Sequence, residues 1–161
     1  MEQRIVTNLW FDTEAEEAAN FYVSVFKNSR ILNKTRYTES GPREAGMVMT
    51  VDFELDGQRL TGINGGPDFK FTEAISLLIN CEDQQEVDYY WERLTDGGQE
   101  GPCGWLRDRY GLSWQVVPSG MEKLFADPDQ ERADRAMRAM LQMKKIDLEE
   151  LNRAADGVPS A

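Results

Sequence analysis

Hydrophobic positions in the first half of the chain switch between a spacing of two and a helical spacing, and these switches predict its elements. Residues 3–12 are rich in β-branched and aromatic residues and predict a strand. The Thr-x-x-Glu pattern of residues 13–16 has the form of a capping box and predicts the start of a helix. The helix is expected to bury the apolar residues that recur at helical spacing, which are Ala15, Ala18, Ala19, Tyr22 and Phe26. Further strands are expected at 30–37, 47–55 and 58–63, the last two joined by the hairpin pair Asp56-Gly57.

The second half repeats this order of elements. Residues 71–81 predict a strand, and Asp83 is a candidate N-cap for the next helix. Gly97-Gly98 is expected to end that helix. Three short strands are expected after it, at 99–103, 105–107 and 112–117. The chain therefore reads β-α-β-β-β twice, as module one (3–67) and module two (71–118). We predict an α+β fold of one domain over residues 1–161, in which the paired βαβββ modules form a curved mixed sheet around a cleft. A plain α+β sandwich is the alternative.

The last forty residues have a different pattern and predict a C-terminal helical hairpin over 120–156. Asp127-Pro128 combines an N-cap with proline at the first helical position. Methionine and alanine then recur at helical spacing, and a second helix is expected from Asp147. Such a hairpin is not stable alone in water, so its Met-rich face must pack against something. Packing on the same chain and packing on a second copy both remain open at this stage.

Charge and hydropathy restrict the partners of the chain. The 161 residues hold 29 acidic and 18 basic side chains, which gives a formal net charge of −11. Nucleic acids and anionic membrane surfaces repel such a chain, so neither is an expected partner. The sequence has no apolar run long enough for a membrane span and no basic and apolar leader segment. We therefore expect a cytoplasmic protein.

The absence of histidine restricts the chemistry further. With no histidine in the sequence, Ser-His-Asp and Cys-His catalysis are excluded. The usual ligand sets for zinc, copper and non-haem iron rely on imidazole and are missing as well. The two cysteines, Cys81 and Cys103, lack CxxC spacing and are expected to be reduced, small apolar residues.

Several segments together resemble one protein family. These are NLWFD with AEEAANFY, NGGPDFKF, INCED with VDYYWERL, and GPCGWLRDRYGLSWQVVP. The chain resembles the PhnB-like proteins, also labelled as the 3-demethylubiquinone-9 3-methyltransferase domain. They belong to the glyoxalase/bleomycin-resistance/extradiol dioxygenase group, the vicinal oxygen chelate superfamily. The resemblance covers about 3–120 and the tail, and it implies a glyoxalase-like domain of paired βαβββ modules that commonly dimerises.

The resemblance also implies where a metal would be held, because the superfamily binds a divalent ion with side chains from four strands. The matching positions fall near Ile5, near Gly62 or Asn64, near Ser76 and at Gln115. Gln115 occupies the place of the usual carboxylate, and Ile5 has no donor atom. Neutral amides bind transition metals poorly without anionic help. We therefore expect no metal and no other cofactor.

The residues near these positions predict a ligand pocket of aromatic and neutral polar side chains. The candidates for ligand binding are Trp10, Asn64, Phe69, Phe71, Ser76, Trp105, Tyr110 and Gln115. Strand alternation places Trp114 on the opposite face from Gln115, and we assign Gln115 to the pocket. Arg107-Asp108-Arg109 supplies either a cation at the pocket mouth for an anionic ligand or a solvated surface ion pair.

Three functions are compatible with this sequence. The first is a metal-free small-molecule-binding protein, homodimeric and cytoplasmic, with an apolar or aromatic ligand. The second is a metal-independent isomerase, lyase or transferase acting on an aromatic or quinone-like substrate, which includes the methyltransferase of the family label. The third is a protein-interaction module that uses the Met-rich C-terminal helix.

Overall fold

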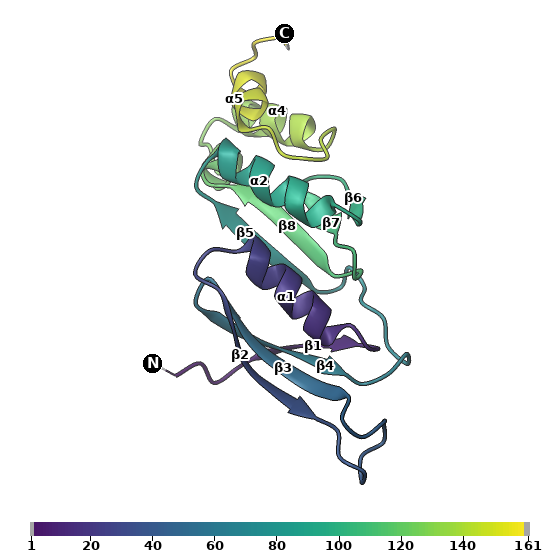
Figure 1. Cartoon of the computed structure of the whole chain (residues 1–161). Coiled ribbons are helices and arrows are strands. Elements are labelled where there is room, and N and C mark those ends of the chain that lie inside the picture. The colour runs from purple at the N-terminus through teal and green to yellow at the C-terminus, as the bar shows by residue number, and fades with distance from the viewer. Residues whose placement is uncertain (1, 160–161) are drawn as a thin grey trace. The chain divides into compact units, whose positions relative to one another are not determined.

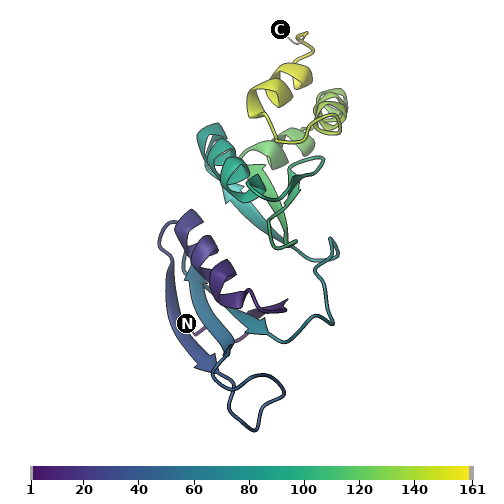
Figure 2. The ribbon, with the colours of Figure 1, turned by 45° about the vertical axis from the view of Figure 1, so that its right-hand side comes forward.

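The computed structural model describes residues 2–159 and divides the chain into two compact units, Met1–Phe71 and Thr72–Ala161. Each unit contains one four-stranded mixed sheet with a helix packed on one face (Figures 1 and 2). The α+β class and the two successive βαβββ patterns are thereby confirmed. Within residues 2–159, no helix has both the length and the apolar character that a membrane span requires.

Unit 1 is built from a strand, a helix and three further strands. These elements are β1 (Thr7–Phe11), α1 (Ala15–Val25), β2 (Arg30–Arg36), β3 (Val48–Leu55) and β4 (Gln58–Asn64). The strand order is β1-β4-β3-β2, in which β1 and β4 run parallel and the other pairs are antiparallel. The core lies between α1 and the sheet, where Tyr22 stacks on Phe53 with ring centroids 6.2 Å apart.

The start of α1 differs from the predicted capping box. The helix begins at Ala15, and its N-cap residue Glu14 makes no side-chain cap. Instead Asn64, at the end of β4, accepts a hydrogen bond from the Ala15 amide at 2.8 Å. The local motif failed because a buried amide from a distant strand satisfies the first amide of the helix.

Unit 2 repeats the order and adds the tail. Its sheet elements are β5 (Ser76–Cys81), α2 (Gln84–Thr95), β6 (Gln99–Glu100), β7 (Trp105–Arg107) and β8 (Ser113–Pro118), in the spatial order β5-β8-β7-β6. The strand predicted at 71–81 is shorter than expected, because residues 71–75 lie outside any strand. The predicted cap of the helix is confirmed: the Asp83 side chain accepts from the Glu86 amide at 2.9 Å.

The tail of unit 2 forms three helices rather than a simple hairpin. They are α3 (Met121–Phe125), α4 (Gln130–Met140) and α5 (Leu148–Ala155). Five buried residues form their common core, namely Leu124, Ala136, Ile146, Leu151 and Ala155, with three methionines packed around them. The Met-rich tail therefore packs on its own chain, as one of the two open alternatives stated.

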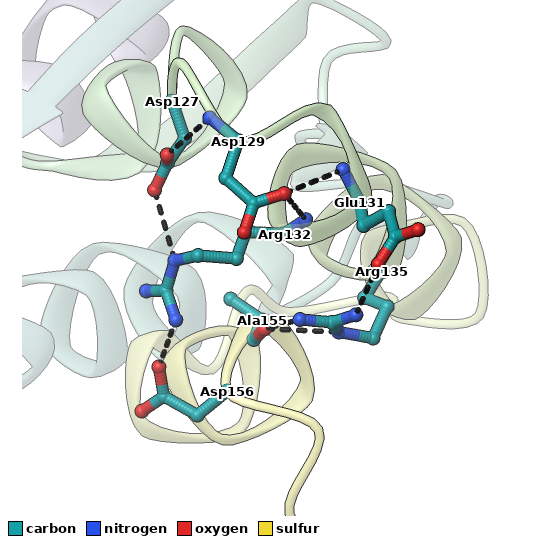
Figure 3. Close-up of polar contacts among 7 residues, drawn as sticks. All are labelled: Asp127, Asp129, Glu131, Arg132, Arg135, Ala155 and Asp156. Carbon is teal, nitrogen blue, oxygen red and sulfur yellow. Dashed lines mark hydrogen bonds and ion pairs between the residues drawn. The ribbon is translucent and has the colours of Figure 1, made fainter.

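Polar contacts fix α4 against α5 (Figure 3). Arg132 pairs with Asp127, before α4, and with Asp156, at the end of α5. Arg135 donates two hydrogen bonds to the Ala155 carbonyl, at 2.9 and 2.6 Å. The pKa of Asp127 is lowered, first by the hydrogen bond from the Asp129 amide and then by Arg132. Arg135 thus supplies donors to a carbonyl in the last turn of α5, where the carbonyls have no partner within the helix.

The segment before α5 also holds a loop of the sheet. The Cys103 amide donates to the Met143 carbonyl and the Gly104 amide to the Lys144 carbonyl, both at 2.8 Å. Gln84, in the first turn of α2, donates to the Ile146 carbonyl at 2.8 Å. The tail is therefore bonded to the loop between β6 and β7.

Candidate functional site

The register of the strands separates the two faces of the sheet in unit 2. Trp114 and Val116 are buried on the face that carries α2, and Leu106 pairs with Trp114 on that face. Residues one position away point to the opposite face. We call that opposite side the open face of unit 2, and its residues include Ser76, Leu78, Trp105, Arg107, Ser113 and Gln115.

Three predicted ligand-binding residues come together on this open face. Gln115 donates a hydrogen bond from Nε2 to Ser76 Oγ at 2.9 Å, and Trp105 is its partner in the register of β7 and β8. Trp114 lies on the helix side, as strand alternation predicted. The geometry thus groups an amide, a hydroxyl and an indole on one surface, while their role in binding remains a prediction.

A pocket of about 220 Å³ lies at the β7 side of the open face. Its lining includes Glu73, Gln99, Glu100, Trp105, Arg107 and Ser113. Arg107 forms an ion pair with Glu73, and both side chains are about half exposed. Sequence reasoning missed Glu73, Gln99, Glu100 and Ser113 as pocket residues. Ser113 was within reach of it, because it lies two positions from Gln115 and shares its face.

Of the Arg-Asp-Arg run, one residue reaches the pocket. Arg107 lines it, whereas Arg109 pairs with Asp96 at 3.3 Å outside it. Asp108 is buried and accepts hydrogen bonds from the Tyr110 and Leu112 amides and from Trp114 Nε1, at 2.8, 3.1 and 2.8 Å. Asp108 therefore fixes the turn between β7 and β8. The candidate Tyr110 lies in that turn and is not among the residues lining the pocket.

In unit 1, two predicted residues lie against each other. The rings of Trp10 and Phe69 meet edge to face with centroids 5.0 Å apart. Trp10 also donates from Nε1 to the Gly66 carbonyl at 2.9 Å. A Cβ atom at Gly65 would lie 2.2 Å from the indole ring. Gly65 thus allows the close approach of Trp10, while Gly66 has a positive φ of 114° that favours glycine.

Two other candidates, Asn64 and Phe71, lie toward the helix side of the sheet in unit 1. Asn64 is 2% exposed, caps α1 and donates from Nδ2 to the Val48 carbonyl at 3.0 Å. Phe71 packs edge to face on Phe11 at 5.4 Å, and Phe11 is buried on the helix side of β1. Asn64 was chosen from the family position, but strand parity points its side chain toward the core.

The other open polar residues of unit 1 are bonded to one another. The hydroxyls of Thr35 and Thr50 lie 2.5 Å apart. Asp52 accepts from Thr61 at 2.6 Å and from Arg59 at 2.9 Å. These side chains form two hydrogen-bonded groups, one that joins β2 to β3 and one that joins β3 to β4.

The residues on these faces do not fit the metal that the fold group implies. Within residues 2–159, no three Asp, Glu, Cys or His side chains converge as a metal-binding group would. Ile5 is 89% exposed and has no donor, and Gly62 lies against α1. Ser76 and Gln115 are neutral and bonded to each other. A divalent transition metal needs anionic or imidazole ligands, which these positions lack.

The thiol of Cys81 is buried and unreactive. Burial, and after it the nearby carboxylate of Glu86, raises the pKa of the Cys81 thiol to about 12, so the thiol stays protonated at neutral pH. A protonated, buried thiol is a poor nucleophile. The expectation of a buried apolar residue is met for Cys81, and Cys103 is half-buried.

Known structures share this fold and define its class. The chain is similar to a putative 3-demethylubiquinone-9 3-methyltransferase, a PhnB protein, from Bacillus cereus, at 38% identity and a TM-score of 0.65, over 73% of this chain and all of that one. A Pseudomonas aeruginosa protein matches at 18% identity and a TM-score of 0.60, over 73% of this chain and 98% of that one. A fosfomycin resistance protein from Listeria monocytogenes, complexed with Mn(II) and sulfate, matches at 14% identity and a TM-score of 0.54, over 78% and 97%. The last two show the glyoxalase-like fold alone.

The particular family follows from the sequence itself. A family model described as 3-demethylubiquinone-9 3-methyltransferase matches residues 3–117. The chain belongs to this family. No curated protein matches the chain. The family match ends before α3, so the tail described above lies outside it.

Proposed function

We propose that this protein binds a small, flat organic molecule on the open face of unit 2, without a resident metal. The observation that supports this most is the pocket lined by Trp105 and Ser113. These two residues pair in the sheet with Gln115 and Ser76, which are hydrogen-bonded to each other. An apolar ring with a few fixed hydrogen-bonding groups is the usual composition of a small-molecule site. The pocket is smaller than the ~300–1,000 Å³ of drug-sized ligands, so it suits a single-ring compound.

The proposed metal-free state is supported by the donor types. Gln115 donates one hydrogen bond to Ser76, and neither side chain carries charge. A neutral pair of this kind orients a ligand by hydrogen bonds, because the amide and the hydroxyl each retain capacity to donate or accept. Elemental analysis of the purified protein tests this part: zinc, iron, nickel or manganese bound at one ion per chain would overturn it.

We also propose a cytoplasmic homodimer. Leu78 is 49% exposed on the open face, and Ile75, just before β5, is 72% exposed. Apolar side chains that gather beside a site are more typical of covered surfaces than of free ones. Light scattering of the purified full chain is expected to give twice the chain mass of 18.4 kDa. A monomer at all concentrations would contradict the proposed dimer, but it would not contradict the proposed ligand binding.

Ligand binding is tested with a library of single-ring aromatic compounds, screened by ligand-observed NMR on the full chain. Hits are expected to lose binding in Trp105→Ala. They are expected to keep it in Tyr89→Ala, because Tyr89 lies on α2, which covers the other face of the sheet, and is 40% exposed. Hits that bind both variants equally would exclude this face as the site. Conversion of a hit to product would replace binding by catalysis.

A further inference from the structure

The strongest indication of a particular ligand is a buried hydroxyl that has no partner. Ser113 is 1% exposed, and its Oγ makes no hydrogen bond with any of residues 2–159. The other buried atom of this kind, Glu16 Oε2, lies 2.8 Å from Lys34 Nζ and is therefore paired. Buried polar groups in native proteins almost always have a partner, so Ser113 calls for one from outside the chain. Its position in the pocket lining allows a ligand to supply it.

A cation lies next to this hydroxyl. Arg107 pairs with Ser113 in the register of β7 and β8, so their side chains are neighbours on one face. The Arg107 side chain is 53% exposed, and its ion pair is with Glu73, which is 54% exposed. Glu73 belongs to the segment before β5, outside any helix or strand. An ion pair this exposed is weak, and a bound anion can replace Glu73 at little cost.

A flat apolar surface completes the arrangement. Trp105 lies two residues before Arg107 on the same strand, so both side chains are on the open face. Guanidinium presents a planar fork of donors that matches a carboxylate, and the hydroxyl of Ser113 adds one more donor. A ring carried by that carboxylate would lie toward Trp105.

We propose that the pocket binds an aromatic carboxylate, with the acid group at Arg107 and Ser113 and the ring against Trp105. In the free protein, Glu73 occupies Arg107 and competes with the ligand. This inference rests on the proposed binding function and specifies its ligand. The remaining acid in the lining, Glu100, is engaged by Trp91 Nε1 at 2.8 Å and by Lys144 at 3.9 Å. These two contacts reduce its repulsion of an anion.

The probes are benzoate and benzamide, which have the same ring and nearly the same shape but differ in charge. Binding to the full chain is measured by saturation-transfer NMR titration at low and high salt. Benzoate is expected to bind at least about tenfold more tightly than benzamide, as a charge-assisted contact provides. Its affinity is also expected to fall as salt screens Arg107.

Four variants locate the contacts. Arg107→Gln is expected to abolish the preference for benzoate and to leave benzamide unchanged. Ser113→Ala is expected to weaken benzoate about threefold to tenfold. Glu73→Gln is expected to tighten benzoate several-fold, because it removes the competing carboxylate. Arg109→Gln is the matched control, since Arg109 pairs with Asp96 outside the pocket, and it is expected to bind as the parent does. Arg107, Arg109 and Glu73 are exposed enough that their variants should fold normally, which thermal unfolding verifies.

The outcomes separate this inference from the proposed function. Equal binding of both probes, or benzoate binding that survives Arg107→Gln, would overturn the aromatic carboxylate and leave a neutral ligand for the same face. Failure of Glu73→Gln to tighten benzoate would overturn the competition. If benzoate does not bind at all while library hits still require Trp105, the binding function stands and the ligand class proposed here is wrong.

Discussion

The sheets of the two units have equivalent strand orders, but the polar side chains on the face away from the helix differ in how they are bonded. In unit 1, the Thr35 hydroxyl bonds to the Thr50 hydroxyl, and the Asp52 carboxylate accepts a hydrogen bond from Thr61. In unit 2, the Ser113 hydroxyl has no hydrogen-bond partner among residues 2–159, and Arg107 pairs with one half-exposed carboxylate. Polar side chains that hydrogen-bond to each other contribute to the stability of the sheet, whereas a buried polar group without a partner lowers that stability. The comparison shows how one of two similar modules can hold a site while the other serves as scaffold.

The helices of the two units differ in a similar way. The first turn of α2 is capped locally by Asp83, while the first amide of α1 is bonded to Asn64 from the end of β4. A local cap can form with the helix itself, but a distant one requires the folded sheet. Unit 1 therefore depends more on long-range contacts at this point, and the following variants test the difference between the units.

The largest effect is expected from Asp108→Ala in unit 2. The change leaves the indole N–H of Trp114 and two backbone amides without their acceptor. Buried donors without a partner cost ~1–3 kcal/mol each, and we expect a loss of about 4 kcal/mol in the free energy of unfolding. Urea unfolding measures it. Asp96→Ala, at an exposed side chain, is the control and should change stability by less than ~0.5 kcal/mol.

The next effect tests the tail, which has no counterpart in unit 1. Ile146 is fully buried in the core of the tail helices. Ile146→Ala is expected to cost about 3 kcal/mol, from lost burial and the cavity left behind. Hydrogen exchange should also accelerate at the Cys103 and Gly104 amides, which donate to the same segment. Unchanged exchange there would show that the tail does not hold the pocket loop, and Ile5→Ala, at an exposed residue, serves as the control.

The two caps provide a smaller and more direct comparison. Asn64→Ala removes a buried hydrogen bond to Oδ1 and a partly buried one from Nδ2, and is expected to cost about 2 kcal/mol. Asp83→Ala removes an exposed N-cap bond and is expected to cost about 1 kcal/mol. Equal losses in urea unfolding would contradict the view that α1 depends on a distant cap.

The smallest effect concerns pH and the thiols. Because the pKa of Cys81 is raised to about 12 in the folded protein, thiolate formation is favoured in the unfolded chain. The contribution of Cys81 to the free energy of unfolding is therefore fully present below the usual thiol pKa of 9.0, and it is lost as the pH rises from there toward about 12. At pH 8, iodoacetamide is expected to label Cys103 alone in the native protein and both cysteines in urea. Mass spectrometry counts the labels, and native labelling of Cys81 would contradict its burial.

The sequence predicted the modules better than it predicted the site. Helical and alternating spacing located α1, α2 and most strands, and parity correctly separated Gln115 from Trp114. Asn64 was taken from a family position, and the structure places it on the helix side of the sheet, because it lies two positions from Gly62, which packs against α1. Strand parity could have placed Ser113 on the face of Gln115, but that its hydroxyl lacks a partner depends on tertiary contacts that no local pattern records. Glu73 was missed because the contact between its loop and a strand is also tertiary.

The hydrogen bonds from Cys103 and Gly104 to the tail have a practical meaning for anyone who shortens this protein. The family match stops at residue 117, yet two carbonyl groups beyond it complete the backbone of a loop within that match. A truncation placed at the end of the family match would therefore separate this loop from the segment that completes its hydrogen bonds. Gly104 illustrates this directly, since an added Cβ there would press on Ile146, a residue that the family pattern does not include.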